Sequence, residues 1–275
     1  MSADKLQQTT VVGFPALRIG GRGDRPPLLF IHGAFVTHEP FAAWMEFLAA
    51  AGWRSVAVSR RGRLGVGPEK AEGLTVADYV EDTRRAVEAL GEAPILVGHS
   101  LGGLIAQKIA EMGLCRGMVL LAPAPPAMLT AQPVAIPAYL RMLPKILAGQ
   151  PLVPACGVCS TIALNCVPED QHPAIHARLI HESGKAYREM IFGAIKVDAG
   201  KVRCPALVVS GGKDRIISPA LARQTAARYG AELKLYPEHG HWLIEERGWQ
   251  AIAGDVGEWL AGRFAARPVP LAGAA

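Results

Sequence analysis

Residues 94–112 read PILVGHSLGGLIAQKIAEM, and this stretch decides the fold. Pro94–Val97 is a short apolar run of strand type, and from Leu101 onward apolar residues recur at helical spacing. Between them, residues 98–102 (GHSLG) fit the pattern G-x-S-x-G. A strand, a tight turn and a helix in this order form the setting in which a serine projects its hydroxyl above the end of a sheet. The stretch therefore predicts a strand–turn–helix unit with Ser100 as a candidate nucleophile.

Five further apolar runs predict buried strands on either side of this unit. Each is short, rich in Leu or β-branched residues, and bounded by Gly or Pro. The six predicted strands are Leu28–His32, Ser55–Val58, Pro94–Gly98, Met118–Ala122, Ala206–Ser210 and Leu233–Tyr236. Apolar runs without alternation suit strands that are covered on both faces, as in a parallel sheet.

The segments between these strands predict helices. They are Phe41–Ala51, Val76–Leu90, Leu101–Met112, Pro219–Tyr229 and Trp249–Phe264. This regular alternation of strand and helix predicts an α/β fold, with a mostly parallel twisted sheet and helices on both of its faces.

The alternation is interrupted between residues 124 and 196. This segment is rich in Pro, has several short helix-like pieces and shows no clear strand. It predicts a helical insertion packed over one end of the sheet, so that residues 1–123 and 197–266 form the core. The tail, residues 267–275, is small and contains Pro, and we expect it to be flexible.

A nucleophilic serine needs a base, and the base needs a group that orients it. Asp214 follows the fifth predicted strand and His241 follows the sixth. Both are therefore expected at the carboxyl edge of the sheet, where Ser100 also lies and where ligands bind in such sheets. The order Ser, acid, His along the chain is the one that this architecture uses. We predict a catalytic triad of Ser100, His241 and Asp214.

The sequence offers other candidates for the acid and the base of this triad. Asp198 precedes the fifth predicted strand and is therefore expected at the opposite edge of the sheet. The fourth predicted strand is followed by Pro123–Pro126, which supplies no acid. His239 stays open as an alternative base, because it is only two residues from His241.

These motifs resemble those of the α/β-hydrolase superfamily, specifically its single-domain esterase-like members with a helical cap. The resemblance spans about residues 28–264 and rests on His32-Gly33, Gly98–Gly103, Gly212-Lys213-Asp214 and Gly240-His241. It implies an α/β-hydrolase fold in which residues 124–196 form the cap. It also implies an oxyanion hole made by the backbone amides of Ala34 and Leu101.

The triad and the resemblance together predict a serine hydrolase that cleaves a carboxylic ester or thioester through an acyl-enzyme. This chemistry needs no metal and no organic cofactor. The candidate lining of an apolar substrate pocket is Phe35, Met128, Tyr139 and Trp242, and core or cap packing would explain each of them equally well. Two alternatives stay open. The same fold and triad could serve a lyase, perhydrolase or carbon–carbon hydrolase reaction, or the protein could be a non-catalytic ligand receptor.

One loop departs from the pattern that the resemblance implies. Similar proteins often have Asp-x-Arg-Gly-x-Gly after the second core strand, whereas residues 59–65 here read SRRGRLG, with Ser59 in place of the acid. Arg60, Arg61 and Arg63 make this loop strongly basic. The simplest interpretation is a solvated surface loop, and the alternative is a loop that contacts an acidic substrate.

Composition narrows the remaining classes of function. The 275 residues are 50% hydrophobic and carry 29 basic and 24 acidic side chains, for a net charge of +5. The basic residues cluster less than phosphate binders require, so no nucleic acid partner is expected. No run reaches the roughly 18 apolar residues of a membrane span. Five cysteines and the lack of a secretory segment favour a reducing, cytoplasmic setting, and the oligomeric state stays open.

Overall fold

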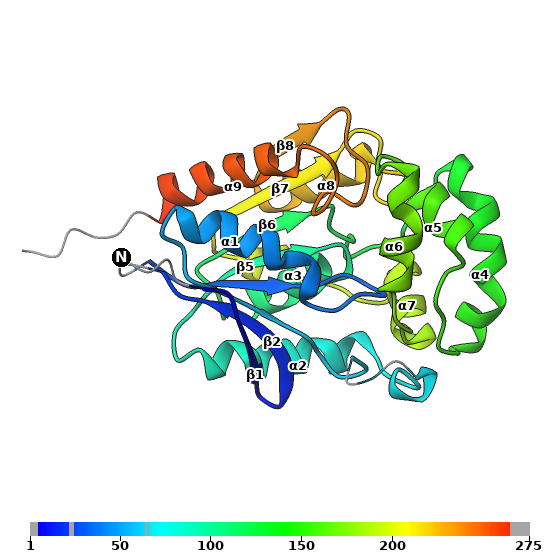
Figure 1. The fold of residues 1–275 in the computed structure, drawn as a ribbon, viewed down its shortest axis with the longest axis horizontal. Coiled ribbons are helices and arrows are strands. Elements are labelled where there is room, and N and C mark those ends of the chain that lie inside the picture. Colours follow the sequence, from blue (N-terminus) through cyan, green and yellow to red (C-terminus); the bar gives the residue numbers. More distant parts are fainter. Residues whose placement is uncertain (1–4, 22–24, 64, 66, 265–275) are drawn as a thin grey trace, which may run out of the picture.

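The computed structural model describes residues 5–21, 25–63, 65 and 67–264. Its centre is an eight-stranded sheet with the strand order β1-β2-β4-β3-β5-β6-β7-β8 (Figure 1). The strands are β1 (Gln7–Val11), β2 (Phe14–Ile19), β3 (Leu28–Ile31), β4 (Ser55–Val58), β5 (Ile95–His99), β6 (Gly117–Leu121), β7 (Ala206–Gly211) and β8 (Glu232–Tyr236). Strands β3 to β8 pair in parallel, so the predicted α/β class and its mostly parallel sheet are confirmed.

The sequence reading missed β1 and β2, which form an antiparallel hairpin at one edge of the sheet. Val12 and Gly13 make the turn, and both have a positive φ, as a two-residue hairpin turn requires. Strand β1 reads QQTTV and is mostly exposed, so it carries no apolar run. An edge strand of this kind is held by its backbone pairing and leaves little pattern in the sequence.

Helices cover both faces of the sheet, as predicted. On one face, α2 (Val76–Ala89), α3 (Leu101–Glu111) and α8 (Pro219–Tyr229) enclose a buried core with the strands. On the other, α1 (Ala42–Ala50) and α9 (Trp249–Arg263) do the same. The central strands are buried along their whole length, which explains why they read as unbroken apolar runs.

Four helices lie between β6 and β7 in the chain. They are α4 (Ile136–Ala148), α5 (Cys156–Ile162), α6 (His172–Ala177) and α7 (Gly184–Ile191). Figure 1 shows them gathered beyond the carboxyl ends of the parallel strands, at the right of the view. We call residues 124–196 the cap. The prediction of a flexible tail at residues 267–275 lies outside the described residues.

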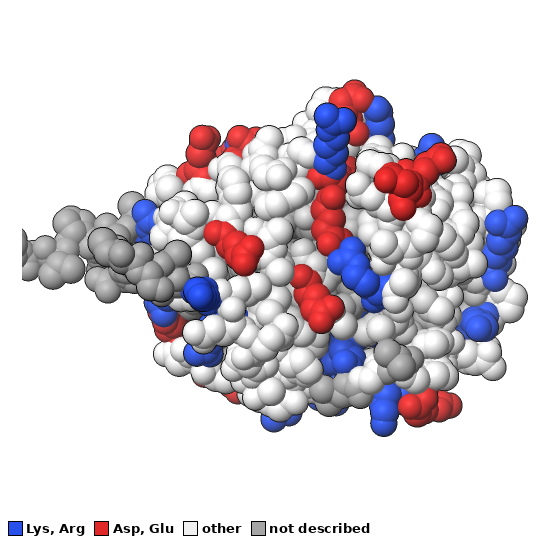
Figure 2. Space-filling view, viewed as in Figure 1, with Lys and Arg blue, Asp and Glu red and all other residues white. Residues whose placement is uncertain are grey.

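The surface and the helix lengths add two observations. On the face that Figure 2 shows, acidic and basic side chains are interspersed, with no large patch of one sign. Within the described part of the chain, no helix has both the length and the apolar character that crossing a membrane requires.

Candidate active site

Ser100 occupies the turn between β5 and α3 in a strained backbone conformation. Its φ is +52° and its ψ is −118°, a region that residues with a side chain rarely adopt. A Cβ atom on Gly102 would lie 2.0 Å from the backbone oxygen of Ile31, and one on Gly98 would lie 2.5 Å from that of Gly102. Glycine at 102 therefore lets the start of α3 pack against the end of β3, and glycine at 98 lets β5 pack against the start of α3.

Backbone donors face the same place. Leu101 opens α3, where amide groups have no partner within the helix. Ala34 follows β3 and borders the same cavity as Ser100. Among the described residues, neither the amide nitrogen of Leu101 nor that of Ala34 has a hydrogen-bond acceptor. Both are free to donate to a ligand.

Asp214 and His241 meet at this edge of the sheet, and both are buried. The Nδ1 atom of His241 lies 2.9 Å from Oδ2 of Asp214. The other carboxylate oxygen, Oδ1, accepts hydrogen bonds of 2.8 Å from the backbone amides of Ile216 and Ile217. A carboxylate can only accept, so His241 carries its proton on Nδ1 in this pair, which leaves Nε2 with a free lone pair.

The structure separates His239 from His241. His239 Nδ1 pairs with Oε2 of Glu246 at 3.0 Å, and this contact lies outside the cavity that Ser100 and His241 line. Glu246 is buried and also accepts the backbone amides of Gly240 and Trp242, at 2.9 and 3.1 Å. It thus braces the loop that carries His241. The sequence reading missed this glutamate, which no spacing rule marks.

Two further histidines, His99 and His32, are buried beside the site. The Nε2 atom of His99 donates to the backbone oxygen of His241 at 2.9 Å. Burial, and then the nearby His241, lower the pKa of His99 to about 3. Burial and the guanidinium groups of Arg60 and Arg63 hold the pKa of His32 well below its usual value. Both rings are therefore neutral at physiological pH.

This neutrality predicts a loss of stability in mild acid. Below a pH of about 6.5 the unfolded chain binds protons at His99 and His32 that the folded chain excludes, so the free energy of unfolding falls as pH falls. For His99 the expected loss is about 2 kcal/mol between pH 7 and pH 5. Urea unfolding at the two pH values measures it. His99→Gln should lose this part of the pH dependence, and an unchanged dependence in that variant would contradict the assignment.

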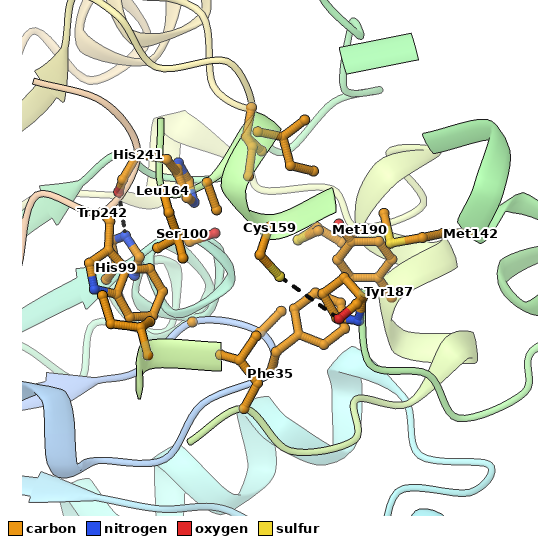
Figure 3. A pocket seen from close by; sticks show the side chains of 18 residues that line it. Phe35, His99, Ser100, Met142, Cys159, Leu164, Tyr187, Met190, His241 and Trp242 are labelled. Atoms are coloured by element: carbon orange, nitrogen blue, oxygen red, sulfur yellow. Dashed lines mark hydrogen bonds between the residues drawn. The ribbon is translucent and has the colours of Figure 1, made fainter. Parts of the chain in front are cut away.

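An apolar cavity connects Ser100 to the cap (Figure 3). Its lining is mostly apolar, as is usual for sites that bind small molecules. Ser100 and His241 lie at one end, and Met142 and Met190 of the cap lie at the other. The remaining cap residues of the lining are Pro154, Cys159, Ile162, Ala163, Leu164, Ile175, Leu179 and Tyr187. More than half of the lining thus comes from the cap. The core adds the rest, which is Gly33, Ala34, Phe35, His99, Ser100, Ile216, His241 and Trp242.

Of the four pocket residues predicted from the sequence, Phe35 and Trp242 line this cavity. The other two do not, and these assignments are corrected here. The side chain of Met128 is 63% exposed, and Tyr139 packs in the cap beside the cavity without lining it. Cys159, for which the sequence predicts no place in the pocket, is buried and does line the cavity.

The basic loop is neither a solvated surface loop nor a free cationic contact, so both predictions for it are corrected. Arg60 and Arg63 are only 3% and 5% exposed. Both form ion pairs with the buried carboxylate of Glu182, a residue of the cap. Arg61 alone is partly exposed, and it is bonded to Asp82. Buried guanidinium groups need such a counter-ion, and the sequence does not show which acid supplies it.

Comparison with known proteins agrees with this architecture. The chain matches the model of the alpha/beta hydrolase family over residues 28–255. It is 30% identical over 230 residues to a monoacylglycerol lipase of Mycolicibacterium smegmatis, which covers 77% of this chain and 79% of that protein. It is 26% identical over 243 residues to a non-heme haloperoxidase of Rhodococcus erythropolis, with 80% of this chain and 86% of that protein covered.

Solved structures show the same fold. The crystal structure of a monoacylglycerol lipase from Paleococcus ferrophilus superposes with a TM-score of 0.67 at 22% identity, covering 94% of this chain and 99% of that one. A soluble variant of the monoglyceride lipase from Saccharomyces cerevisiae gives a TM-score of 0.74 at 16% identity, with 96% and 97% covered. The family model matches residues 28–255, and the parallel sheet and the strained serine turn agree with that match. The chain therefore belongs to the alpha/beta hydrolase family.

Proposed function

We propose that this protein is a serine hydrolase that cleaves carboxylic esters with an apolar acyl group, through an acyl-enzyme on Ser100. The observation that carries the proposal is the hydrogen bond between Asp214 and His241, since this imidazole lines the same apolar cavity as Ser100. Three of the similar proteins are named as monoacylglycerol or monoglyceride lipases, which supports an ester with an apolar acyl chain.

The geometry supports the following steps. Asp214 keeps the proton of His241 on Nδ1, so Nε2 is available to accept the hydroxyl proton of Ser100. The oxygen of Ser100 then attacks the carbonyl carbon of the ester. The C–O bond to the alcohol breaks, and the alcohol leaves with the proton from His241. Water attacks the acyl-enzyme in the same way, with His241 again as the base, and releases the acid.

The negative charge that forms on the carbonyl oxygen needs donors. In this proposal the backbone amides of Ala34 and Leu101, which have no partner among the described residues, supply them. One such donor contributes about 3 kcal/mol of transition-state stabilisation, or a factor of 10² to 10³ in rate. The positive end of the α3 dipole acts in the same direction.

The cavity gives the proposal a quantitative form. Each CH₂ group moved from water into an apolar site contributes about 0.8 kcal/mol, which is roughly a fourfold gain in kcat/KM. For a series of p-nitrophenyl esters we therefore expect kcat/KM to rise with acyl length until the chain fills the cavity, and then to level off or fall. A fluorophosphonate probe should form one adduct, on the peptide that carries Ser100. Mass spectrometry and ester assays on the purified protein measure both.

The outcomes separate the alternatives. If no adduct forms, or if it forms on another residue, the proposed nucleophile is wrong. An adduct without turnover of any ester would favour a lyase or a ligand receptor. Thioesters in the same acyl series test whether the leaving group matters. Peracid formation from a carboxylic acid and hydrogen peroxide tests a perhydrolase reaction. The similarity to a non-heme haloperoxidase is the reason for this test.

A further inference from the structure

A buried ionic cluster lies directly behind the loop that carries Ala34. It consists of Arg60, Arg63, Tyr79 and Glu182, and we call it the Arg60–Glu182 cluster. The two guanidinium groups share one carboxylate oxygen of Glu182, and Tyr79 donates to the other at 2.6 Å. The guanidinium of Arg60 also stacks over the ring of Tyr79, 4.5 Å from its centre. The loop at 60–63 and helix α2 thus meet at one cap residue.

Arg60 holds two carbonyl groups of the loop. Its Nη1 donates to the backbone oxygen of His32 and its Nη2 to that of Gly33, both at 2.9 Å. The peptide bond between Gly33 and Ala34 is planar and trans, so its carbonyl and its N–H point in opposite directions. Because Arg60 binds the carbonyl oxygen of Gly33, it sets the direction of the Ala34 N–H on the opposite side of the same peptide.

This peptide lies beside the nucleophile. A Cβ atom on Gly33 would lie 3.3 Å from Cβ of Ser100, so a single peptide separates Arg60 from the serine. Gly33 and Ala34 both line the cavity, whereas Arg60 does not. Arg60 therefore acts on the site through the backbone and does not meet a substrate.

Glu182 fixes the next peptide from the cap. Its Oε2 accepts the amide of Phe35 at 3.4 Å, and the oxygen of Phe35 accepts the amide of Ile180 at 2.8 Å. Phe35 has a φ of +66°, a left-handed conformation that costs free energy for a residue with a side chain. The cap thus holds the loop in a form that it would not keep alone.

The net charge of the cluster also supports an effect of Arg60 on the Ala34 amide. Two guanidinium groups face one carboxylate, which leaves a net positive charge behind the loop. Burial, and then Arg63, lower the pKa of Arg60 to about 10, so it stays charged at neutral pH. The pKa of Glu182 is lowered: burial alone would raise it, but Arg63 and Arg60 outweigh that effect. A cation bound to a carbonyl polarises its peptide and strengthens the N–H on the far side as a donor.

We propose that Arg60 is a positioning residue of the oxyanion hole, which aims and polarises the amide of Ala34, and that Glu182 completes this arrangement from the cap. The inference rests on the proposed function. It assigns a task to Arg60, one of the three arginines of this loop whose role the sequence left open. Arg60 is not expected to touch the substrate.

The test compares Arg60→Met with Arg61→Met. Arg61 is the adjacent arginine, but it pairs with Asp78 and Asp82 and binds no carbonyl of the oxyanion loop. For Arg60→Met we expect kcat to fall by 10² to 10³, the effect of losing one oxyanion donor, with KM within about threefold of the wild type. Affinity for an alkyl boronic acid, which forms a tetrahedral adduct on the serine, should fall in parallel. Arg61→Met should leave kcat and this affinity unchanged.

Further readouts separate the possible failures. Urea unfolding of both variants gives the folded fraction, and Arg60→Lys, which keeps the charge but cannot grip both carbonyls, should recover part of kcat. If Arg60→Met does not fold, Arg60→Lys alone carries the test. If the wild type hydrolyses esters and binds the boronic acid while folded Arg60→Met or Arg60→Lys keeps full kcat, the positioning proposal is wrong. If the wild type neither labels nor turns over esters, the proposed function fails instead.

Discussion

Ser100→Ala should lower kcat for ester hydrolysis by about 10⁶, with little change in KM, because the variant loses the covalent step and keeps the cavity. The residual rate should exceed that in water by 10³ to 10⁴, since the amides of Ala34 and Leu101 and the binding cavity remain. Steady-state kinetics on the ester series measures the loss. The fluorophosphonate adduct should disappear completely.

The structure supplies the control for this variant. Removing one hydroxyl from a site that already tolerates a positive φ adds no clash, so the free energy of unfolding should stay within about 1 kcal/mol of the wild type. A variant that folds normally, loses labelling and still hydrolyses esters at the original rate would show that another residue attacks. A variant that unfolds would be uninformative, and Ser100→Cys, which keeps a weaker nucleophile, would then replace it.

His241→Ala should have an effect of similar size, about 10⁶ in kcat, because the serine then has no base. His239→Ala should change kcat less than threefold, since His239 pairs with Glu246 outside the cavity. The two histidines are separated by a single residue, so this pair is a closely matched comparison. Kinetics at pH 7 on the best ester measures both.

Combining variants sharpens this prediction. Residues that act as one unit give losses that do not add, so Ser100→Ala with His241→Ala should be about as slow as either alone. If the loss of kcat in the double variant equals the product of the two single losses, the two side chains act independently. A large loss in His239→Ala with activity retained in His241→Ala would reverse the assignment of the base.

The sequence alone predicted the frame of the fold closely. The six parallel strands and the five main helices coincide with the observed elements within about two residues, because most of them bury a face that only apolar side chains can fill. Asp214 and His241 could be placed for the same reason. A residue just after a parallel strand must lie at one edge of the sheet, and the chain offers few polar candidates there.

The remaining parts depend on contacts between segments far apart in the chain. The cavity is lined mainly by short cap helices whose apolar residues serve packing and binding alike, so Met128 and Cys159 could not be told apart by pattern. Glu182 lies about 120 residues from Arg63 in the sequence, and no periodicity links them. An ion pair of this kind is visible only once the chain is folded.

The Arg60–Glu182 cluster has a consequence for the modularity of this protein. A cap that merely covers a pocket could be exchanged between relatives to alter selectivity. Here the cap supplies the carboxylate that neutralises two guanidinium groups of the core. A transplanted cap without an acid at the position of Glu182 would leave those charges buried and unpaired, at a cost of about 3–5 kcal/mol. Exchanging the cap to change substrate selectivity would therefore also change the stability of the core. Recombination must keep residue 182 together with the loop at 60–63.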